Sequence, residues 1–319
     1  MSDPLVHRLS RYRFFSAGVA LAAAPVVVRA QALEKLRLSA VPTDDMTPVF
    51  WGLKTGVFRR AGIDLELIPV SSGTASTTAV VSGTYEMGKA SPVAAMLAHL
   101  RGLPVTIIAN GAVYQGKDQW TGIVVTTDSP IKTAIDCNGK TGCVAGLNDI
   151  HQLALMNWMD KNGGDSRTTK WVEVPGSATA PAIIEHRIDF SMLDEPLFSA
   201  ALETGKIKKI GDAYGTIADR WLTSGYLVQP DYAAKHPDLM RRFARALYEA
   251  TAYANRHPAE TIAMMSDVTK IPLPVYSKMA RIQAATNSDP RILQPIIDAT
   301  ARYKIIARSF PAEELYWRG

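Results

Sequence analysis

Short apolar runs alternate with longer amphipathic segments along the first third of the chain. The runs that we expect to be strands, each bounded by Gly, Pro, Ser or Asp, cover 35–41, 64–68, 85–89 and 105–109. The segments that we expect to be helices cover 48–60, 74–81 and 93–100. Gly62 and Gly83 follow two of these helices, as is common after a helix end. Strands and helices in this order predict βαβ units and a parallel sheet.

The second half of the chain echoes this arrangement. A strand at 170–174 leads through Pro175-Gly176-Ser177 into a helix ending at 187, and a strand at 189–193 precedes Pro196. The first half has the same succession of strand, Pro, small turn, helix, strand and Pro at nearly the same spacing. Such an echo predicts two similar α/β lobes. The last third reads as helices that pack back onto the first lobe, at 237–257, 258–266, 272–284 and 291–303.

Two polar, glycine-bearing segments, 110–117 and 223–226, have the character of crossings between the lobes. We therefore predict an α/β fold of two Rossmann-like lobes joined by a two-segment hinge. The first lobe would comprise residues 33–113 and 227–319, and the second lobe residues 114–226. Ligands of open α/β sheets bind at the carboxyl ends of the strands, and here those ends face the cleft between the lobes.

The first 32 residues have the pattern of an export signal. Arg8, Arg11 and Arg13 precede an apolar run at 14–28, and Ala30-Gln31-Ala32 is a small-x-small cleavage pattern. The apolar run is shorter than the roughly 20 residues of a membrane span. We expect residues 1–32 to be removed and the protein to be periplasmic, with the Sec and twin-arginine routes both open. Removal takes away four Arg and one Asp, and lowers the formal net charge from +5 to +2.

Several kinds of site are disfavoured by the composition. The mature chain has no run of Lys and Arg, which argues against nucleic-acid binding. Its two cysteines and scattered histidines lack the spacing of metal ligands, so we expect neither a metal nor another cofactor. Cys137 and Cys143 flank a turn; two buried thiols are favoured over a disulfide, which so short a loop closes with difficulty.

Five loops should face the predicted cleft, and they supply most of the candidate ligand-binding residues. Taken one at a time, Ser72, Ser91 and Asp149 are better explained as helix caps, and the convergence of several such residues on one cleft is what favours binding. Aromatic residues near the loops and crossings add candidates for stacking on a flat ligand. The candidates are Asp44, Asp45, Met46, Thr47, Trp51, Ser72, Gly73, Thr74, Ser91, Tyr114, Trp120, Asn148, Asp194 and Glu195.

The charge of these loops favours one kind of ligand. They contain five carboxylates, two of them Asp44 and Asp45, and neither Lys nor Arg; Lys89 lies nearby on a strand. An inorganic anion would meet an acidic rim, whereas an amine or a heterocyclic N–H would find acceptors. Carboxylates that cap helices or pair with surface lysines are the alternative explanation.

Several short motifs occur in a fixed order along the chain. They include Gly56-Val57-Phe58 to Gly62, the segment Ser82-Gly83-Thr84-Tyr85-Glu86-Met87-Gly88, and further segments at 66–74, 101–105 and 136–141. In this order they resemble the substrate-binding proteins of ABC importers of the nitrate/sulfonate/taurine and thiamine-precursor type, whose first helix ends in a similar way and whose Ser/Ala-Gly-x-x-Asp-x-Gly element is similar to 82–88. The chain departs from the family at Lys89, where a small or apolar residue is usual, and at Cys137.

The resemblance implies a periplasmic type II binding protein that closes on a small solute and delivers it to an ABC permease and its ATPase. It also implies ligand contacts at Asp44 to Thr47, Ser72 to Thr74, Ser91, Asn148 and Glu195. The solute would be amine-bearing, heterocyclic or sulfonate-like, and we expect a monomer that is not an enzyme. Two alternatives stay open: a periplasmic sensor, and a pyrimidine synthase of the same fold, whose cysteine-rich motif is missing here.

Overall fold

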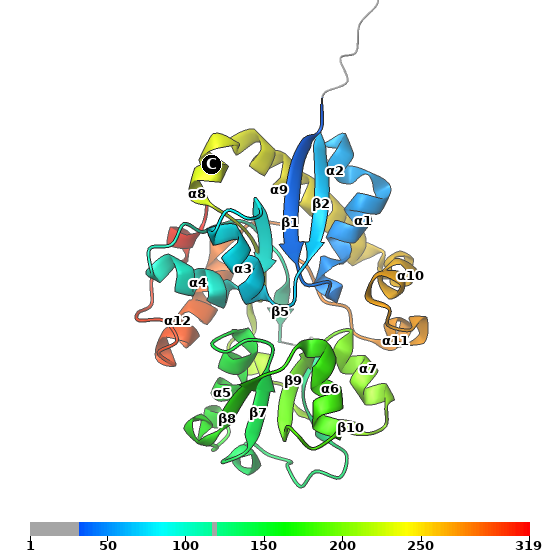
Figure 1. The fold of residues 1–319 in the computed structure, drawn as a ribbon, viewed down its shortest axis with the longest axis vertical. Helices are drawn as coiled ribbons and strands as arrows, with labels where there is room; N and C mark the ends of the chain where they lie inside the picture. The colour runs from blue at the N-terminus through cyan, green and yellow to red at the C-terminus, as the bar shows by residue number, and fades with distance from the viewer. Residues whose placement is uncertain (1–31, 117–119) are drawn as a thin grey trace, which may run out of the picture. The chain divides into compact units, whose positions relative to one another are not determined.

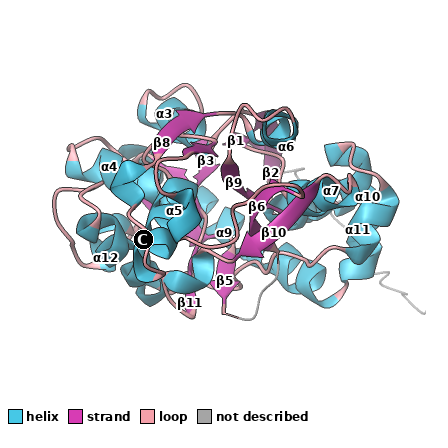
Figure 2. Cartoon of the chain, turned by 90° about the horizontal axis from the view of Figure 1, so that it is seen from below, coloured by secondary structure: helices cyan, strands magenta, loops and turns pink. Residues whose placement is uncertain are grey.

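Two five-stranded sheets form the framework of the protein. The computed structural model describes residues 32–116 and 120–319, and the predicted export signal lies outside them apart from Ala32. Residues Leu33–Gly319 form one compact unit. Figure 2 shows strands in the middle of this unit with helices on either side.

The first sheet has the strand order β2-β1-β3-β12-β4. Its strands are β1 (Glu34–Ala40), β2 (Ile63–Pro69), β3 (Met87–Ala90), β4 (Thr106–Asn110) and β12 (Gly225–Val228). Strands β2, β1 and β3 are parallel, as predicted, because a helix connects each to the next. The expectation of an all-parallel sheet is wrong, since β12 inserts antiparallel to both β3 and β4. It enters from the crossing at Thr223 and therefore runs in the opposite direction.

Helices of the first lobe follow the predicted order, with one interruption. They are α1 (Thr47–Thr55), α2 (Val57–Arg60), α3 (Gly73–Val81) and α4 (Pro92–Leu100). The single helix predicted at 48–60 is broken at Gly56, which has a φ of 75° and so ends α1 in the left-handed conformation. Gly62 and Gly83 also have positive φ, as expected of residues that follow helix ends.

The second sheet has the strand order β10-β6-β9-β7-β8. Its strands are β6 (Thr121–Thr126), β7 (Thr141–Val144), β8 (Lys170–Glu173), β9 (Phe190–Asp194) and β10 (Ile207–Gly211), and its helices are α5 (Ile150–Lys161), α6 (Gly176–Ile184) and α7 (Leu197–Glu203). Strands β7, β8 and β9 are parallel, whereas β6 pairs antiparallel with β9 and β10. This sheet lies in the lower part of Figure 1, below the first one.

A two-stranded ribbon lies at the crossings between the sheets. Strand β5 (Val113–Gln115) leaves the first sheet and pairs antiparallel with β11 (Arg220–Leu222), which leads back towards β12. The return crossing is held by the backbone N–H of Thr223, which donates to the carbonyl of Ala112 at 3.0 Å. Our assignment of the two lobes remains a proposal, with Gly225 and Tyr226 moved to the first lobe as part of β12.

The C-terminal region is helical and packs mainly against the first sheet and its helices. It contains α8 (Pro230–Lys235), α9 (Pro237–Arg256), α10 (Pro258–Thr269), α11 (Leu273–Lys278) and α12 (Gln294–Arg302). Buried residues recur along α9 at helical spacing, and Phe243 stacks on Phe58 with ring centroids 5.7 Å apart. The helix predicted at 272–284 ends early at Lys278, since Arg281 and Ile282 form hydrogen bonds with Asp44 outside any helix.

Cys137 and Cys143 are both buried and free, which confirms the interpretation favoured above. Burial raises the pKa of Cys137 to about 12, so this thiol stays protonated at neutral pH. Among the helices that the structure describes, none is both long and apolar enough to cross a membrane.

Packing between α3 and β3 gives a first testable prediction. A Cβ added at Gly88 would lie 2.5 Å from Ser76 Oγ and 2.8 Å from Val80 Cγ2. Overpacking a core costs about 1–3 kcal/mol, so Gly88→Ala should lower the free energy of unfolding by that amount in urea denaturation. Gly225→Ala is the control, because its Cβ would meet no atom closer than 3.5 Å. Equal stabilities for the two variants would contradict the close packing of α3 on β3.

Candidate functional site

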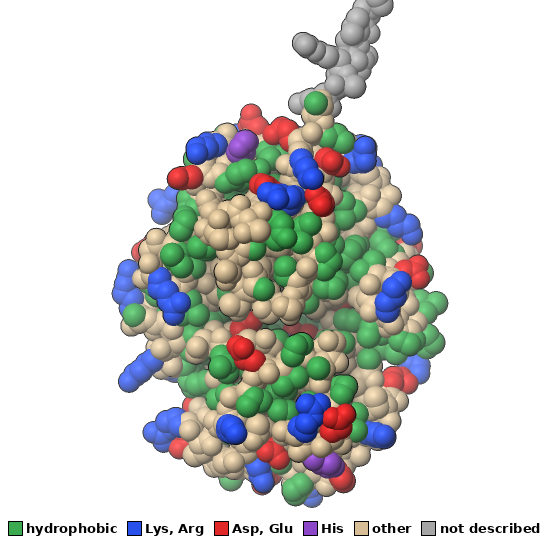
Figure 3. All heavy atoms as spheres, viewed as in Figure 1, with side chains coloured by type: hydrophobic (Ala, Val, Ile, Leu, Met, Phe, Trp, Pro, Cys, Tyr) green, Lys and Arg blue, Asp and Glu red, His purple; other side chains and the backbone are tan. Residues whose placement is uncertain are grey.

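A cavity of about 190 Å³ lies where the two lobes and the crossings meet. The first lobe lines it with Thr43, Asp45, Gly73, Lys89 and Ser91, and the second lobe with Trp120, Asp149, His151, Asp194 and Tyr214. The crossings contribute Ala112, Thr223 and Ser224. Figure 3 shows the surface hollowed between the two halves, with carboxylates in the hollow. The carboxyl ends of strands in both sheets therefore open into one space, as parallel α/β sheets require.

A buried ion pair forms the first-lobe side of the cavity. Lys89, at the end of β3, contacts Asp45 Oδ2, and both residues are 7% exposed. Asp45 also accepts hydrogen bonds from Thr43 Oγ1 at 2.6 Å and from Ser224 Oγ at 2.9 Å. Burial raises the pKa of Asp45, but Lys89 and the two hydroxyls outweigh burial and leave the pKa below its ordinary value. The lysine charge is therefore already balanced by Asp45.

The second-lobe side of the cavity contains two further carboxylates and a histidine. Asp149, at the N-terminus of α5, accepts a hydrogen bond from Ser91 Oγ across the cleft and from the backbone N–H of Ile150. His151 Nε2 lies 3.0 Å from Asp194 Oδ2. Burial lowers the pKa of His151, but the carboxylates of Asp194 and Asp149 outweigh burial and leave the pKa above its ordinary value. The two carboxylates thus stabilise the charged form of this imidazole.

An aromatic cluster forms one wall. Trp120 and Tyr214 line the cavity, with their ring centroids 5.3 Å apart in an edge-to-face arrangement. Behind them, Tyr114 and Trp221 contact the same rings, and the Tyr114 hydroxyl donates to Asp212 at 2.8 Å. Rings packed this way are rigid and can offer a flat apolar surface to a ligand.

The structure places five of the fourteen predicted ligand-binding residues on this cavity. They are Asp45, Gly73, Ser91, Trp120 and Asp194. All five lie at or near the ends of elements that point into the space between the lobes. The other nine lie outside its lining.

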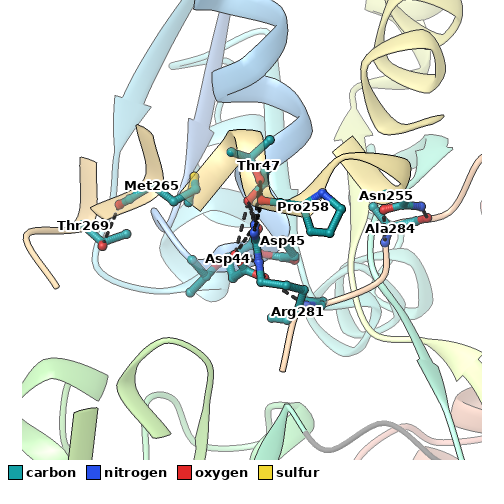
Figure 4. A network of polar contacts seen from close by, with 12 residues as sticks. Asp44, Asp45, Thr47, Asn255, Pro258, Met265, Thr269, Arg281 and Ala284 are labelled. Carbon is teal, nitrogen blue, oxygen red and sulfur yellow. Dashed lines mark hydrogen bonds and ion pairs between the residues drawn. The ribbon is translucent and has the colours of Figure 1, made fainter. Parts of the chain in front are cut away.

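Asp44 and Thr47 belong to a polar network on the far side of the loop (Figure 4). Arg281 pairs with Asp44 Oδ1 at 2.8 Å and donates to Thr47 Oγ1 at 3.0 Å. Asp44 also accepts from the backbone N–H of Ile282, so its oxygens are occupied by the C-terminal region. The side chains of Asp44 and Asp45 therefore point to opposite sides, and of these two carboxylates only Asp45 lines the cavity.

Each of the remaining residues has another structural role. Met46 is fully buried in the core, Trp51 stacks on Tyr253 with centroids 4.7 Å apart, and Tyr114 lies behind the aromatic wall. Ser72 caps α3 by accepting from the backbone N–H of Ala75, and Thr74 is exposed on that helix. Asn148 has a φ of 57° and its backbone N–H donates to Gln152.

Glu195 is buried next to Asp194 in sequence but does not line the cavity. Its carboxylate accepts hydrogen bonds from the Ser199 hydroxyl at 2.6 Å and from the Ser199 backbone N–H at 3.1 Å, and the residue is 2% exposed. Burial, with help from the nearby charges of Asp44 and Asp194, raises the pKa of Glu195 to about 7.

Sequence reasoning left most of the cavity lining out of the predicted set, including Lys89, Asp149, His151, Tyr214, Thr223 and Ser224. The sequence places Lys89 on a strand near the loops, and Thr223 and Ser224 in a crossing. His151 follows the N-cap of α5 by two residues, and this position after a strand is the signal that could have identified it. The described residues contain no group of three or more His, Cys, Asp or Glu that could hold a metal ion.

The buried ion pair predicts a strong effect of removing one partner. Lys89→Met leaves the Asp45 carboxylate buried without a counter-charge, which costs about 3–5 kcal/mol of unfolding free energy. The double variant Asp45→Asn/Lys89→Met should recover most of that loss in urea denaturation. A double variant no more stable than Lys89→Met would contradict the pairing.

The raised pKa of Glu195 predicts that the free energy of unfolding depends on pH. Its pKa is raised from 4.5 to about 7, so the folded protein binds this proton more tightly than the unfolded chain does. The resulting stabilisation is complete below pH 4.5 and is lost as the pH rises through 7. Relative to Glu195→Gln, the wild type should lose about 2 kcal/mol between about pH 5 and pH 8. The exposed-site control Glu313→Gln should follow the wild type; parallel curves for wild type and Glu195→Gln would refute the assignment.

The chain is similar in sequence to proteins of two kinds. It is 24% identical over 225 residues to 4-amino-5-hydroxymethyl-2-methylpyrimidine phosphate synthase of Schizosaccharomyces pombe, a match covering 67% of this chain and 63% of the relative. It is 23% identical over 208 residues to a putative aliphatic sulfonates-binding protein of Escherichia coli, covering 65% of this chain and 63% of the relative. The chain thus matches less than two thirds of the length of either relative.

The prediction that the chain is not an enzyme is contradicted by the first of these relatives, which is named as a synthase. The missing cysteine-rich motif was not a sufficient reason to exclude an enzyme. It concerns one short motif, whereas the similarity to the synthase covers 67% of the chain.

A solved structure establishes the fold. The alkanesulfonate-binding protein SsuA from Xanthomonas axonopodis pv. citri, bound to MOPS, superposes with a TM-score of 0.77 at 15% identity, covering 90% of this chain and 99% of that protein. The predicted type II periplasmic binding protein fold is confirmed. Residues 43–261 match the family model described as NMT1/THI5 like, which is more than half of the chain and includes most of the cavity lining. The resemblance stated from the sequence is confirmed, and the chain belongs to the NMT1/THI5-like family.

Proposed function

We propose that the protein is the periplasmic solute-binding component of an ABC importer. It captures a small organic solute in the cavity between its lobes and delivers the solute to a membrane permease coupled to an ATPase. The observation that carries the proposal is the cavity itself, which both lobes and both crossings line. A solute held there contacts both walls, so binding favours the closed arrangement of the lobes.

Contacts across the cavity support such a closing motion. Ser91, at the start of α4, bonds directly to Asp149, at the start of α5 in the other lobe. At the rim, Lys278 on α11 pairs with Glu203 on α7 at 3.3 Å. Within residues 32–116 and 120–319, the chain passes between the lobes at the two crossings, and hinges commonly consist of a few such connecting residues.

The charges of the lining favour an organic solute with N–H groups. Asp45, Asp149 and Asp194 face one lysine, Lys89, and one histidine, His151. The lining is therefore acidic by one charge when His151 is protonated and by two when it is neutral. An inorganic anion or a simple sulfonate would be repelled by this lining, whereas an amine or a heterocyclic N–H would not.

The periplasmic location rests on the N-terminal sequence pattern and on the fold. A basic segment, an apolar run and a small-x-small end precede the first strand. The protein would act there as a monomer that meets its permease transiently.

A second candidate function is the synthesis after which the S. pombe relative is named. The observation in its favour is a histidine and a lysine in the same cavity, where a substrate would contact both. Formation of a pyrimidine phosphate product, or iron in the purified protein, would favour this function over solute capture.

A thermal-shift screen tests the proposal. Residues 33–319 should be stabilised by one or more aminopyrimidines, aryl amines or aminosulfonates, by about 2.7 kcal/mol at a hundredfold excess over Kd. Nitrate should leave the melting temperature unchanged. Tight binding of nitrate with no response to any organic solute would overturn the proposed solute class.

A further inference from the structure

Three buried side-chain atoms among the described residues have no hydrogen-bond partner: Asp194 Oδ1, Thr223 Oγ1 and the Tyr276 hydroxyl. Two of these three belong to residues that line the cavity, Asp194 and Thr223. Buried polar atoms are nearly always paired in folded proteins, and an unpaired one marks a position where a partner is missing. Two residues with such atoms on one cavity are candidates for contacts with a bound ligand.

One carboxylate oxygen of Asp194 has hydrogen-bond partners, and the other is buried without one. Its Oδ2 lies 3.0 Å from His151 Nε2 and accepts from the Tyr214 hydroxyl at 3.4 Å, which holds the carboxylate at the end of β9. Its Oδ1 has no donor from the described residues. An ionised carboxylate oxygen is an acceptor only, so its missing partner must be a donor.

Thr223 lies on the return crossing, between β11 and β12, and is 7% exposed. Its backbone N–H is bonded to Ala112, whereas its hydroxyl has no partner from the described residues. A hydroxyl both donates and accepts, so Thr223 suits a hydroxyl or carbonyl group of a ligand. A ligand that reaches both residues connects the second lobe to the crossing.

The other carboxylates of the lining already have partners. Asp45 is paired with Lys89 and bonded to Thr43 and Ser224, and Asp149 accepts from Ser91 and the backbone of Ile150. A cationic group entering the cavity therefore finds its best unoccupied acceptor at Asp194. The aromatic rings of Trp120 and Tyr214 line the same cavity and suit a flat body carrying that group.

We propose that Asp194 and Thr223 determine the specificity of the cavity: the ligand donates an N–H group to Asp194 Oδ1 and bonds to the Thr223 hydroxyl through a second polar group. The proposal rests on the solute-capture function above. It assigns the ligand class as small, flat organic molecules that carry an amine or another N–H donor at one end and a hydroxyl or carbonyl group at the other.

Three matched probes test the assignment by calorimetry with residues 33–319. They are 4-(hydroxymethyl)benzylamine, 4-methylbenzylamine and 4-methylbenzoate, which share one ring and differ in a single group. The wild type should bind the hydroxymethyl amine most tightly, the methyl amine several-fold more weakly, and the benzoate not at all. Asp194→Asn should weaken both amines by about 10- to 100-fold, the range of a hydrogen bond to a charged group.

Thr223→Val should abolish the preference for the hydroxymethyl amine while leaving the methyl amine unaffected. The exposed-site controls Asp231→Asn and Thr78→Val should bind like the wild type. Melting temperatures without ligand separate binding from folding, because removing an unpaired hydroxyl should not destabilise the free protein.

Unchanged amine affinity in Asp194→Asn, or a retained hydroxymethyl preference in Thr223→Val, would overturn the assignment. Binding of 4-methylbenzoate alone would also overturn it, while leaving solute capture intact. If no amine binds at millimolar concentration the assignment fails, and the proposed function fails with it only when the wider solute screen gives no response either.

Discussion

The buried pair of Asp45 and Lys89 is the interaction on which the rest of the site depends. The two residues carry opposite charges, each is only 7% exposed, and they lie at the carboxyl end of the first sheet. Burying either charge alone would cost several kcal/mol, so the two must be placed together or not at all. Through Ser224, the same carboxylate also holds the return crossing, which leads into β12. One interaction thus links a loop, a central strand and the hinge region.

This pairing also sets the electrostatic character of the cavity. Because Lys89 is balanced by Asp45, the remaining charge comes from Asp149 and Asp194 with His151 between them. The acidic character inferred from the loops therefore persists although Lys89 lines the same cavity. The similarity to a named synthase and the fold shared with an alkanesulfonate-binding protein do not by themselves determine the ligand of this cavity. The lining residues, and not the fold, decide what it accepts.

The sequence was most informative where structure is local. Short apolar runs bounded by turn residues predicted β1, β2, β8 and β9 to within a few residues, because both signals are local to the sequence. Structure that depends on distant contacts was not predictable in this way. The antiparallel β12 depends on where the chain returns from the second lobe, and α11 stops early because Asp44, more than 230 residues away in sequence, binds Arg281 and Ile282.

The same distinction applies to the cavity. Residues at strand ends, such as Ser91 and Asp194, could be placed near it from topology alone. Asp44 and Glu195 could not be separated from Asp45 and Asp194, since side-chain direction in a tight turn depends on partners elsewhere. The most direct test of the account is a crystal structure of residues 33–319 with the amine that binds most tightly. We expect the amine nitrogen within about 3 Å of Asp194, with Lys89 still paired to Asp45. A ligand bound to Lys89 through an anionic group, with Asp45 displaced, would contradict the account.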